Sequence, residues 1–228
     1  MNGNTDYHDN IFLRFSYSFI KLTLGTFVRL VWVKKVEGIE NIPKAGAVIV
    51  AFNHQSYFDF LCFISISPRK IHFLSAEKFF SHPLWGPLVK MTGQIKVERE
   101  SHDKGNLDEI ILKHLERGKM VGIFPEGTRS PFEKEMLEAF TGVAKYALRG
   151  GVPVLPVGIK GTYEVMAKHD KKPKLKKIVT IHIGTPMHFA EYSHFKADKK
   201  TYRLLTDKVM LEIARLSGKN YVHVGKFE

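Results

Sequence analysis

The chain has almost no cysteine, since Cys62 stands alone among 228 residues. A single cysteine excludes a disulfide framework within the chain and indicates a reducing compartment. The sequence also has no CxxC pair, and its histidines fall outside the usual ligand spacings, so we expect no metal site. Repeats, low-complexity tracts and Gly/Ser-rich linkers are absent too. Nothing therefore divides the chain, and its length fits one domain with a sizeable core.

Short strand-like runs alternate with helical stretches along the chain. This alternation predicts a single α/β domain with a mixed, largely parallel sheet of about seven strands, flanked by helices on both faces. The expected strands are residues 33–36, 47–52, 71–75, 94–98, 120–124, 152–157 and 178–183. The expected helices are residues 59–66, 83–91, 107–117, 134–148 and 199–216.

A polar segment, NHQSYFD at residues 53–59, directly follows the apolar run 47–52. Open α/β sheets usually place their reactive groups at such strand ends. His54 and Asp59 lie five residues apart and cannot share one face of a straight helix, so we expect His54 in the turn and Asp59 in the first turn of a helix beginning near Ser56. The carboxylate can then hold one imidazole nitrogen and leave the other as a base. The alternative is an ordinary turn histidine beside a helix-capping aspartate.

A second polar segment, PEGTRS at residues 125–130, follows another expected strand. Gly127 permits a positive φ, so the amides around Gly127 and Thr128 can turn inward to face an anion. Arg129 adds a positively charged fork suited to phosphate. The alternative is an exposed turn in which Glu126 and Arg129 form a solvated pair.

Four motifs in order resemble the glycerolipid acyltransferase family, whose best-known members are the 1-acylglycerol-3-phosphate acyltransferases. Together they cover roughly residues 50–160, and the ordered set is far more specific than any one motif. The matches are His-x4-Asp with its Asn and Ser (Asn53, His54, Ser56, Asp59), Gly-x-Ile-x-Val-x-Arg (Gly93, Ile95, Val97, Arg99), Phe-Pro-Glu-Gly-Thr-Arg-Ser (124–130) and Val-Pro-Val-x-Pro-Val (152–157).

The resemblance implies that His54, oriented by Asp59, removes a proton from a lysophospholipid hydroxyl, whose oxygen then attacks an acyl thioester directly. The donor would be acyl-coenzyme A or an acyl carrier protein, and no cofactor is needed. Because a thioester is already activated, Ser56 is assigned to the helix cap and Cys62 to the core rather than to a nucleophile. The implied substrate-binding residues are Asn53, Ser56, Arg99, Glu126, Gly127, Thr128 and Arg129.

Two positions depart from the family pattern. The family often has Phe-Lys-x-Gly after its third motif, where this chain reads AFTG at residues 139–142. A lysine is also common where this chain has Ala76, and Lys78 follows two residues later. Basic side chains that could help to hold the acceptor's phosphate are thus missing or moved, which weakens the assignment of the acceptor lipid.

The sequence accordingly predicts an acyltransferase that converts 1-acylglycerol-3-phosphate into phosphatidic acid in phospholipid biosynthesis. One alternative is an acyltransferase for a different lysolipid, such as an acylated amino-acid lipid. Another is a non-catalytic lipid-binding protein of the same fold. The intact His54, Asp59 and residues 124–130 argue against the second, because binding alone would not require the base.

Basic residues outnumber acidic ones, 35 to 23, which gives a net charge of +12. The densest basic stretch is residues 168–177, a predicted loop. A solvated loop is one reading, and contact with anionic lipid headgroups or an acidic acyl carrier protein is the other. The chain has no recognised RNA- or DNA-binding motif, so nucleic acid is not an expected partner.

Residues 1–33 are expected to form a membrane-associating segment ahead of a catalytic domain at 34–228. A spanning helix needs about 20 mostly uncharged residues, and Lys21 near the middle opposes crossing. No small-residue cleavage site follows, so a signal peptide is not expected. We therefore expect an amphipathic helix over about 11–33 that lies in the membrane surface on the cytoplasmic face, the alternative being a core helix packed on the sheet. Its narrow polar stripe consists of Arg14, Ser18, Lys21, Gly25 and Arg29.

Overall fold

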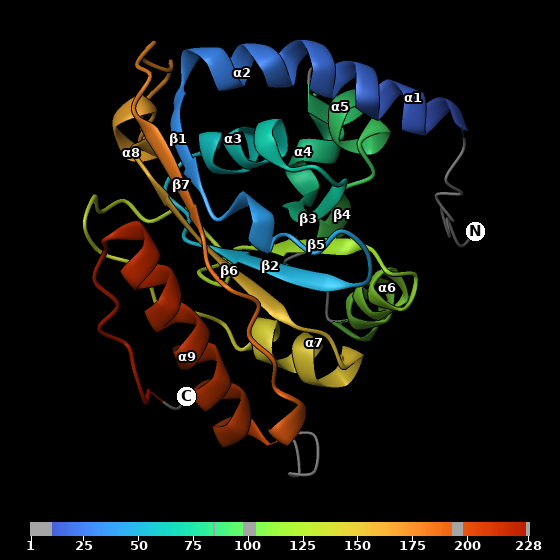
Figure 1. The fold of residues 1–228 in the computed structure, drawn as a ribbon, viewed down its shortest axis with the longest axis vertical. Coiled ribbons are helices and arrows are strands. Elements are labelled where there is room, and N and C mark those ends of the chain that lie inside the picture. Colours follow the sequence, from blue (N-terminus) through green and yellow to red (C-terminus); the bar gives the residue numbers. More distant parts are fainter. Residues whose placement is uncertain (1–10, 84, 98–103, 193–197, 227–228) are drawn as a thin grey trace.

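The computed structural model describes residues 11–83, 85–97, 104–192 and 198–226 (Figure 1). Within these residues, seven strands form one sheet in the order β1-β7-β6-β2-β5-β3-β4. Each strand lies where the sequence predicts one, and the predicted α/β fold class is confirmed. The strands are β1 (Val33–Glu37), β2 (Val48–Phe52), β3 (Ile71–Ala76), β4 (Ile95–Val97), β5 (Met120–Ile123), β6 (Val154–Lys160) and β7 (Val179–Ile183).

The sheet is mixed, as predicted. Strands β6, β2, β5, β3 and β4 run parallel, whereas β7 is antiparallel to β6 and parallel to β1. Strands β2 and β5 are neighbours, and Ala51 pairs with Ile123 near their carboxyl ends. The segments that follow these two strands therefore leave the sheet side by side at the same edge.

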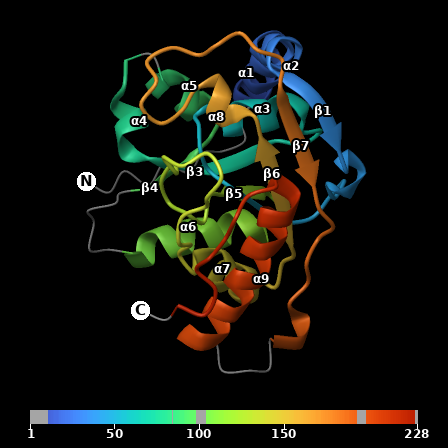
Figure 2. The same cartoon turned by 90° about the vertical axis from the view of Figure 1, so that its left-hand side faces the viewer.

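Helices cover both faces of the sheet (Figures 1 and 2). Helices α1, α2 and α3 lie over one face, and α6, α7 and α9 lie over the other. The helical segments are α1 (Ile11–Ile20), the π-helical turn η1 (Lys21–Gly25), α2 (Thr26–Val31), the 3-10 turn η2 (Ile39–Asn41), α3 (Phe58–Ile66), α4 (Glu77–Ser81), α5 (Trp85–Met91), α6 (Lys104–Glu116), α7 (Gly142–Gly150), α8 (Thr162–Val165), the 3-10 turn η3 (Ala190–Tyr192) and α9 (Lys199–Ser217).

Strand β2 is buried on both faces, which explains why it reads as an unbroken apolar run. Ile49 and Ala51 pack in the core cluster beneath α6, α7 and α9. Val48, Val50 and Phe52 point the other way, into the cluster that α2 and α3 cover. Because β2 is packed between these two core clusters, it holds the start of the following polar segment in a fixed position.

The predicted helix at 134–148 is wrong in its first half, because α7 begins only at Gly142. Backbone amides in the earlier part bond to distant groups: Met136 N donates to Asn220 O at 3.0 Å, and Leu137 N donates to the Glu126 carboxylate at 2.7 Å. These long-range partners replace the local hydrogen bonds of a helix, so tertiary contacts override helix propensity here.

The predicted N-terminal helix is present, since α1, η1 and α2 run continuously from Ile11 to Val31. Its orientation differs from a simple amphipathic pattern because part of the polar stripe faces the protein. Gly25 is buried against α3, and Lys21 Nζ donates to the carbonyl oxygen of Ser67 at the end of α3. The outward apolar face consists of Phe15, Phe19, Leu22, Leu24, Phe27 and Leu30, all exposed.

No helix among the described residues combines the length and apolar character needed to cross a bilayer. The helix ends against the core: Val28 and Trp32 are buried, and the Trp32 indole donates to the carbonyl oxygen of Lys174 at 2.9 Å. Trp32 also packs on Phe58, with ring centroids 4.8 Å apart. The inner face of the N-terminal helix therefore packs against the α/β core.

Candidate active site

His54 and Asp59 meet at the carboxyl end of β2. His54 Nδ1 lies 2.9 Å from Asp59 Oδ2, and the histidine side chain keeps 14% of its accessibility while the carboxylate is fully buried. As the spacing predicts, Asp59 stands in the first turn of α3 and His54 in the turn before it. With Nδ1 facing the carboxylate, Nε2 is the ring nitrogen that can exchange a proton with a substrate.

Three donors converge on one oxygen of Asp59. Besides His54, the backbone amides of Gln55 and Ser56 donate to Oδ2 at 2.8 and 2.9 Å. The other oxygen, Oδ1, is buried and accepts no hydrogen bond from the described residues. The two amides fix the carboxylate from the same turn that carries His54, so the turn itself sets the geometry of the pair.

Glu126 lies inside the protein, with 2% of its surface exposed. Its Oε1 accepts a hydrogen bond from His54 N, and its Oε2 accepts one from Leu137 N, both at 2.7 Å. Burial raises the pKa of Glu126 to about 8. The sequence suggested a substrate contact or a solvated pair with Arg129, but both carboxylate oxygens are committed to backbone amides. Glu126 instead ties the His54 turn to the segment before α7.

Further bonds join the two polar segments. Ser130 N donates to His54 O at 2.7 Å, and the Gln55 side-chain amide donates to the carbonyl oxygens of Phe132 and Glu133. Phe124, the residue after β5, stacks on the His54 imidazole with ring centroids 4.0 Å apart and an interplanar angle of 24°. The imidazole is thus held by a ring on its face and a carboxylate at its edge.

Arg129 lies over the ring of Tyr57, with its guanidinium carbon 3.8 Å from the ring centroid. Phe79 supports Tyr57 from the side, in an edge-to-face contact of 5.3 Å. Stacking on an aromatic face keeps a guanidinium flat and charged and leaves the N–H donors at its edge for other partners. Arg129 is therefore a preorganised cation next to the His54 turn.

The side chains of Asn53 and Ser56 both form hydrogen bonds with backbone groups. The Asn53 side-chain amide exchanges two hydrogen bonds with Ile159 of β6, at 2.9 and 2.8 Å, and is fully buried. Ser56 Oγ donates to Met166 O at 2.7 Å and accepts from Phe58 N at 3.2 Å. The helix begins at Phe58, near Ser56 as predicted, but its N-terminal cap residue is Tyr57, so the assignment of Ser56 to the cap is wrong. Direct substrate binding, predicted for both residues, does not fit these buried, committed side chains.

Gly127 has the positive φ that the sequence predicts, at 65°. Its amide, however, donates to Phe124 O at 2.9 Å instead of turning toward an open anion site. A Cβ at this position would lie 2.7 Å from the ring of Phe140, so glycine also permits that ring to pack close. Thr128 is half-buried beside Arg129, and the predicted ligand Arg99 lies outside the described residues.

Several residues of this site were missed from the sequence: Gln55, Tyr57, Phe124 and Ser130. Tyr57 stands between Ser56 and Asp59, and only that position hinted at its role. Cys62, in contrast, was placed correctly in the core, where burial raises the pKa of its thiol and removes it from thiolate chemistry.

Comparison with known proteins agrees with this arrangement. The sequence profile of the family named Acyltransferase matches residues 34–160, which is more than half of the chain and includes both polar segments. The chain belongs to the acyltransferase family.

This acyltransferase is similar to three named proteins in particular. The 1-acyl-sn-glycerol-3-phosphate acyltransferase of Bacillus subtilis is 28% identical over 204 residues, which cover 89% of this chain and 98% of the relative. The lyso-ornithine lipid O-acyltransferase of Pseudomonas aeruginosa is 34% identical over 118 residues, 51% of this chain and 44% of that protein. The crystal structure of the Thermotoga maritima 1-acyl-sn-glycerophosphate acyltransferase superimposes with a TM-score of 0.72 at 26% identity, covering 92% of this chain and 83% of that one.

Proposed function

We propose that this acyltransferase moves a fatty acyl group from a thioester donor to the free hydroxyl of 1-acylglycerol-3-phosphate, giving phosphatidic acid in phospholipid biosynthesis. The observation that carries the proposal is the His54–Asp59 contact of 2.9 Å at the carboxyl end of β2. Its support from relatives is the Bacillus subtilis enzyme, which aligns over 98% of its own length.

In this proposal His54 is the general base. Nε2 removes the proton from the acceptor hydroxyl, and the oxygen attacks the thioester carbonyl carbon. The carbon–sulfur bond then breaks, and the leaving thiolate receives the proton from the imidazolium, so neither an acyl-enzyme nor a cofactor takes part. Asp59 stabilises the imidazolium between the two proton transfers. Base catalysis of this kind contributes about 10²–10⁴-fold, and juxtaposition of the two substrates supplies much of the rest.

Arg129 is the proposed contact for the acceptor's phosphate, together with Arg99. The guanidinium of Arg129 is held on Tyr57, 3.8 Å from the ring centroid, and a fixed fork suits a phosphate oxygen pair. Thr128 belongs to the same short turn. Glu126, Gly127, Asn53 and Ser56 act on the backbone of the turn and thereby position His54.

The enzyme works at a membrane surface in this proposal, as a peripheral or monotopic protein on the cytoplasmic face. The outward apolar face of α1–α2 would enter the headgroup region, because its aromatic and leucine side chains have no protein cover: Phe15, Leu22 and Leu30 are 75%, 72% and 63% exposed. The basic loop 168–177 lies beside the end of α2, where Trp32 bonds to Lys174 O. Its exposed lysines suit an anionic surface.

A different lysolipid acceptor is the second candidate. Phe140 stands where relatives of this family often have lysine, and it is 67% exposed next to Gly127. An apolar ring at this point favours an acceptor with less anionic charge than a phosphomonoester. The Pseudomonas aeruginosa relative, 34% identical over 118 residues, is named a lyso-ornithine lipid O-acyltransferase.

One assay tests both candidates. Acyl-coenzyme A and acyl carrier protein are each paired with 1-acylglycerol-3-phosphate, lyso-ornithine lipid and neutral lysolipids, and His54→Ala measures the uncatalysed background. We expect the highest kcat/KM with 1-acylglycerol-3-phosphate. A preference for lyso-ornithine lipid would mean that this lipid, and not 1-acylglycerol-3-phosphate, is the acceptor. If no donor–acceptor pair gave transfer above the His54→Ala background, the enzymatic function would be overturned.

A further inference from the structure

The C-terminal segment that follows α9 packs against the loop between β5 and α7 (Figure 2). Asn220 N donates to Lys134 O at 2.8 Å, and Met136 N donates to Asn220 O at 3.0 Å. These bonds form an isolated parallel bridge between Glu135 and Asn220. The family profile ends at residue 160, so the loop is held here by a part of the chain that the profile does not include.

Lys219 adds a side-chain bond to this contact. Its Nζ donates to Glu133 O at 2.6 Å, and the Gln55 side-chain amide donates to the same oxygen at 2.8 Å. One carbonyl oxygen therefore connects the C-terminal segment to the residue that follows His54. The Gln55 backbone amide also donates to Asp59 Oδ2 at 2.8 Å, so a single residue separates this carbonyl from the catalytic pair.

The same loop holds Glu126. Leu137 N donates to one oxygen of this carboxylate, and His54 N donates to the other. The loop thus contacts the His54 turn at two points, one through Glu126 and one through Gln55. Lys219 acts on the Gln55 contact, because both side chains share one acceptor.

Lys219 is also a half-buried cation close to several carboxylates. Burial lowers the pKa of its ammonium, and nearby carboxylates act in the opposite direction. These carboxylates are Glu164, Asp59, Glu133 and Glu126. Asp59 is the one that pairs with His54, and its Oδ1 accepts no hydrogen bond from the described residues. A cation nearby offsets part of the cost of burying such an oxygen.

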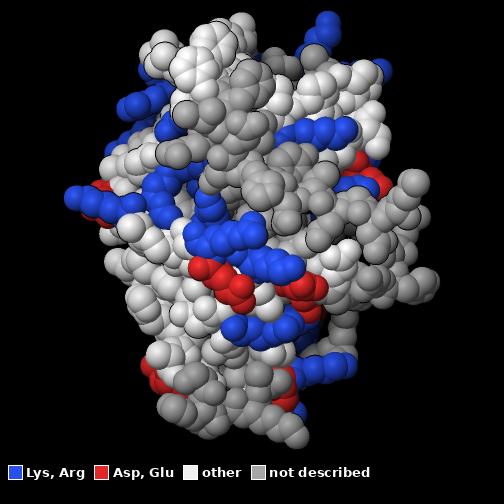
Figure 3. All heavy atoms as spheres, turned by 90° about the vertical axis from the view of Figure 1, so that its right-hand side faces the viewer, with Lys and Arg blue, Asp and Glu red and all other residues white. Residues whose placement is uncertain are grey.

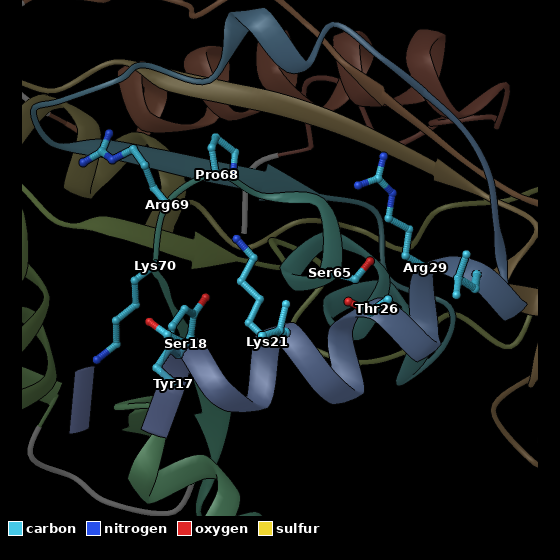
Figure 4. A pocket seen from close by; sticks show the side chains of 11 residues that line it. Tyr17, Ser18, Lys21, Thr26, Arg29, Ser65, Pro68, Arg69 and Lys70 are labelled. Carbon is cyan, nitrogen blue, oxygen red and sulfur yellow. The ribbon is translucent and has the colours of Figure 1, made fainter. Parts of the chain in front are cut away.

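Lys21 also contacts α3, but at the other end of the helix. It lines an open cavity between the N-terminal helix and the last turn of α3, and it donates to Ser67 O (Figure 4). The length of α3, about 13 Å, separates this end from the first turn, where Asp59 stands. Lys219 approaches the beginning of α3 instead, through its link to Gln55.

We propose that Lys219 is a positioning residue for the catalytic pair, which holds the Gln55 side chain through the Glu133 carbonyl and supplies positive charge near Asp59. The proposal rests on acyl transfer with His54 as the base. The hydrogen bond keeps the turn in its working geometry. The charge disfavours a second cation nearby, and the His54 imidazole therefore stays neutral, as a base must be, until it takes the acceptor's proton.

The test uses three variants of the full chain. Lys219→Met removes the ammonium and keeps an unbranched side chain, whereas Lys219→Arg keeps the charge and has donors for Glu133 O. Lys226→Met removes the same charge from an exposed lysine of the same C-terminal segment. Circular dichroism melts check that each variant is folded. The transfer assay then gives kcat, the KM of each substrate, and kcat/KM as a function of pH.

We expect Lys219→Met to lower kcat by about 10- to 100-fold, since a small displacement of a catalytic group costs up to about 10²-fold. Both KM values should stay within about twofold. The acidic limb of kcat/KM should move to higher pH by about half a unit, because an imidazolium that loses a neighbouring cation forms more readily.

Lys219→Arg should recover most of the rate and leave the acidic limb in place, and Lys226→Met should match wild type. A merely structural role would lower the rate without moving the limb. Wild-type kcat in Lys219→Met, or a lower kcat with an unmoved limb, would therefore overturn the proposal.

Hydrogen exchange keeps this proposal separate from the proposed function, because it needs no turnover. Residues 53–59 include three backbone amides that donate to the buried carboxylates of the site. Their exchange should be about tenfold faster in Lys219→Met and unchanged in Lys219→Arg and Lys226→Met. Equal exchange in all the proteins would overturn the positioning role. Wild-type transfer no higher than the His54→Ala background would overturn the function alone.

Discussion

At the scale of single residues, the candidate active site depends on one turn that holds its own base. Asp59 Oδ2 receives the His54 imidazole and two backbone amides from the same turn. These donors hold the carboxylate in place against the ring, where it can stabilise an imidazolium. The pair could be predicted from the sequence because the spacing permits the contact and the four ordered motifs resemble those of the glycerolipid acyltransferases.

Asp59→Asn tests this electrostatic role. The amide oxygen can still accept from Gln55 N and Ser56 N, so the turn should persist, but an amide cannot stabilise the imidazolium. We expect kcat to fall by about 10²–10⁴-fold, with about 1–3 kcal/mol of stability lost through weaker hydrogen bonds. Steady-state kinetics and denaturant unfolding measure the two effects. Activity within about tenfold of wild type would contradict the mechanism.

Tyr57→Leu tests the support of Arg129. Without the ring 3.8 Å from the guanidinium carbon, the side chain should sample more rotamers and bind the acceptor less well. We expect the acceptor KM to rise about 2- to 30-fold, the range that corresponds to a cation–π contact, with the donor KM unchanged. Tyr57→Phe is the matched control and should behave as wild type, since it keeps the aromatic face. A change in donor KM alone would assign Arg129 to the other substrate.

The buried Glu126 makes stability depend on pH. Its pKa is raised to about 8 from an ordinary 4.5, so the folded state keeps a proton that the unfolded state loses. Its stabilising contribution is complete below pH 4.5 and disappears as pH rises through 8, since the folded state binds more protons over this window. We expect Glu126→Gln to remove this component of the pH dependence, measured by urea unfolding at pH 5, 6.5 and 8.

The matched control for that measurement is Glu135→Gln, an exposed carboxyl in the same segment. It makes the same Glu-to-Gln replacement without touching the bonds to His54 N and Leu137 N. The difference in unfolding free energy between wild type and Glu126→Gln should shrink as pH rises, whereas the difference for Glu135→Gln should stay flat. A flat difference for both would mean that Glu126 is ionised in the folded protein.

At the scale of elements, the strands could be predicted more reliably than the helix ends. Strand β2 reads as a continuous apolar run because both its faces are buried, and β5 and β6 share this property. The start of α7 could not be predicted, because Leu137 N and Met136 N bond to groups far along the chain. The same limit applies to Glu126, whose bond to His54 spans 72 residues. Local sequence patterns predict structure that is determined by residues nearby in the chain. The start of α7 and the contacts of Glu126 depend on tertiary contacts instead.

The sequence pattern predicts the N-terminal helix but not which of its faces packs against the rest of the protein. The polar residues Lys21 and Gly25 contact α3, and the apolar side chains face outward. Removal of the whole segment would also remove Val28 and Trp32 from the core, so a deletion would confuse anchoring with folding. Point substitutions on the outward apolar face avoid that difficulty.

Phe19→Ser/Leu22→Ser tests the anchor directly. Both side chains are exposed, at 60% and 72%, so folding stability should change by no more than about 0.5 kcal/mol. Transfer of each apolar side chain into lipid is worth about 1.5–3 kcal/mol, and binding to neutral phosphatidylcholine vesicles should therefore weaken at least tenfold. Leu204→Ser/Leu211→Ser on α9 is the matched control, with exposures of 49% and 47%. If both variants still sediment like wild type, the outward apolar face is not the anchor.

At the scale of the whole molecule, the net charge of +12 is distributed unevenly. On the side that carries α1 and α6, Lys and Arg side chains gather across the middle of the face, with Asp and Glu side chains beneath them (Figure 3). The loop 168–177 adds positive charge beside the end of α2. Apolar and cationic surfaces thus adjoin the same helix, and Trp32 connects that helix to Phe58, the neighbour of Asp59.

The contact between Trp32 and Lys174 spans 142 residues and has a consequence for how the protein is made. A ribosome delivers the first helix and β1 long before β7, the strand that pairs with β1, has been synthesised. Contacts of such range form late in folding, so the nascent helix has to wait with its apolar side chains uncovered. In the membrane function proposed above, a bilayer would shelter these side chains during that interval. The chain would then reach the membrane before its catalytic turn is complete.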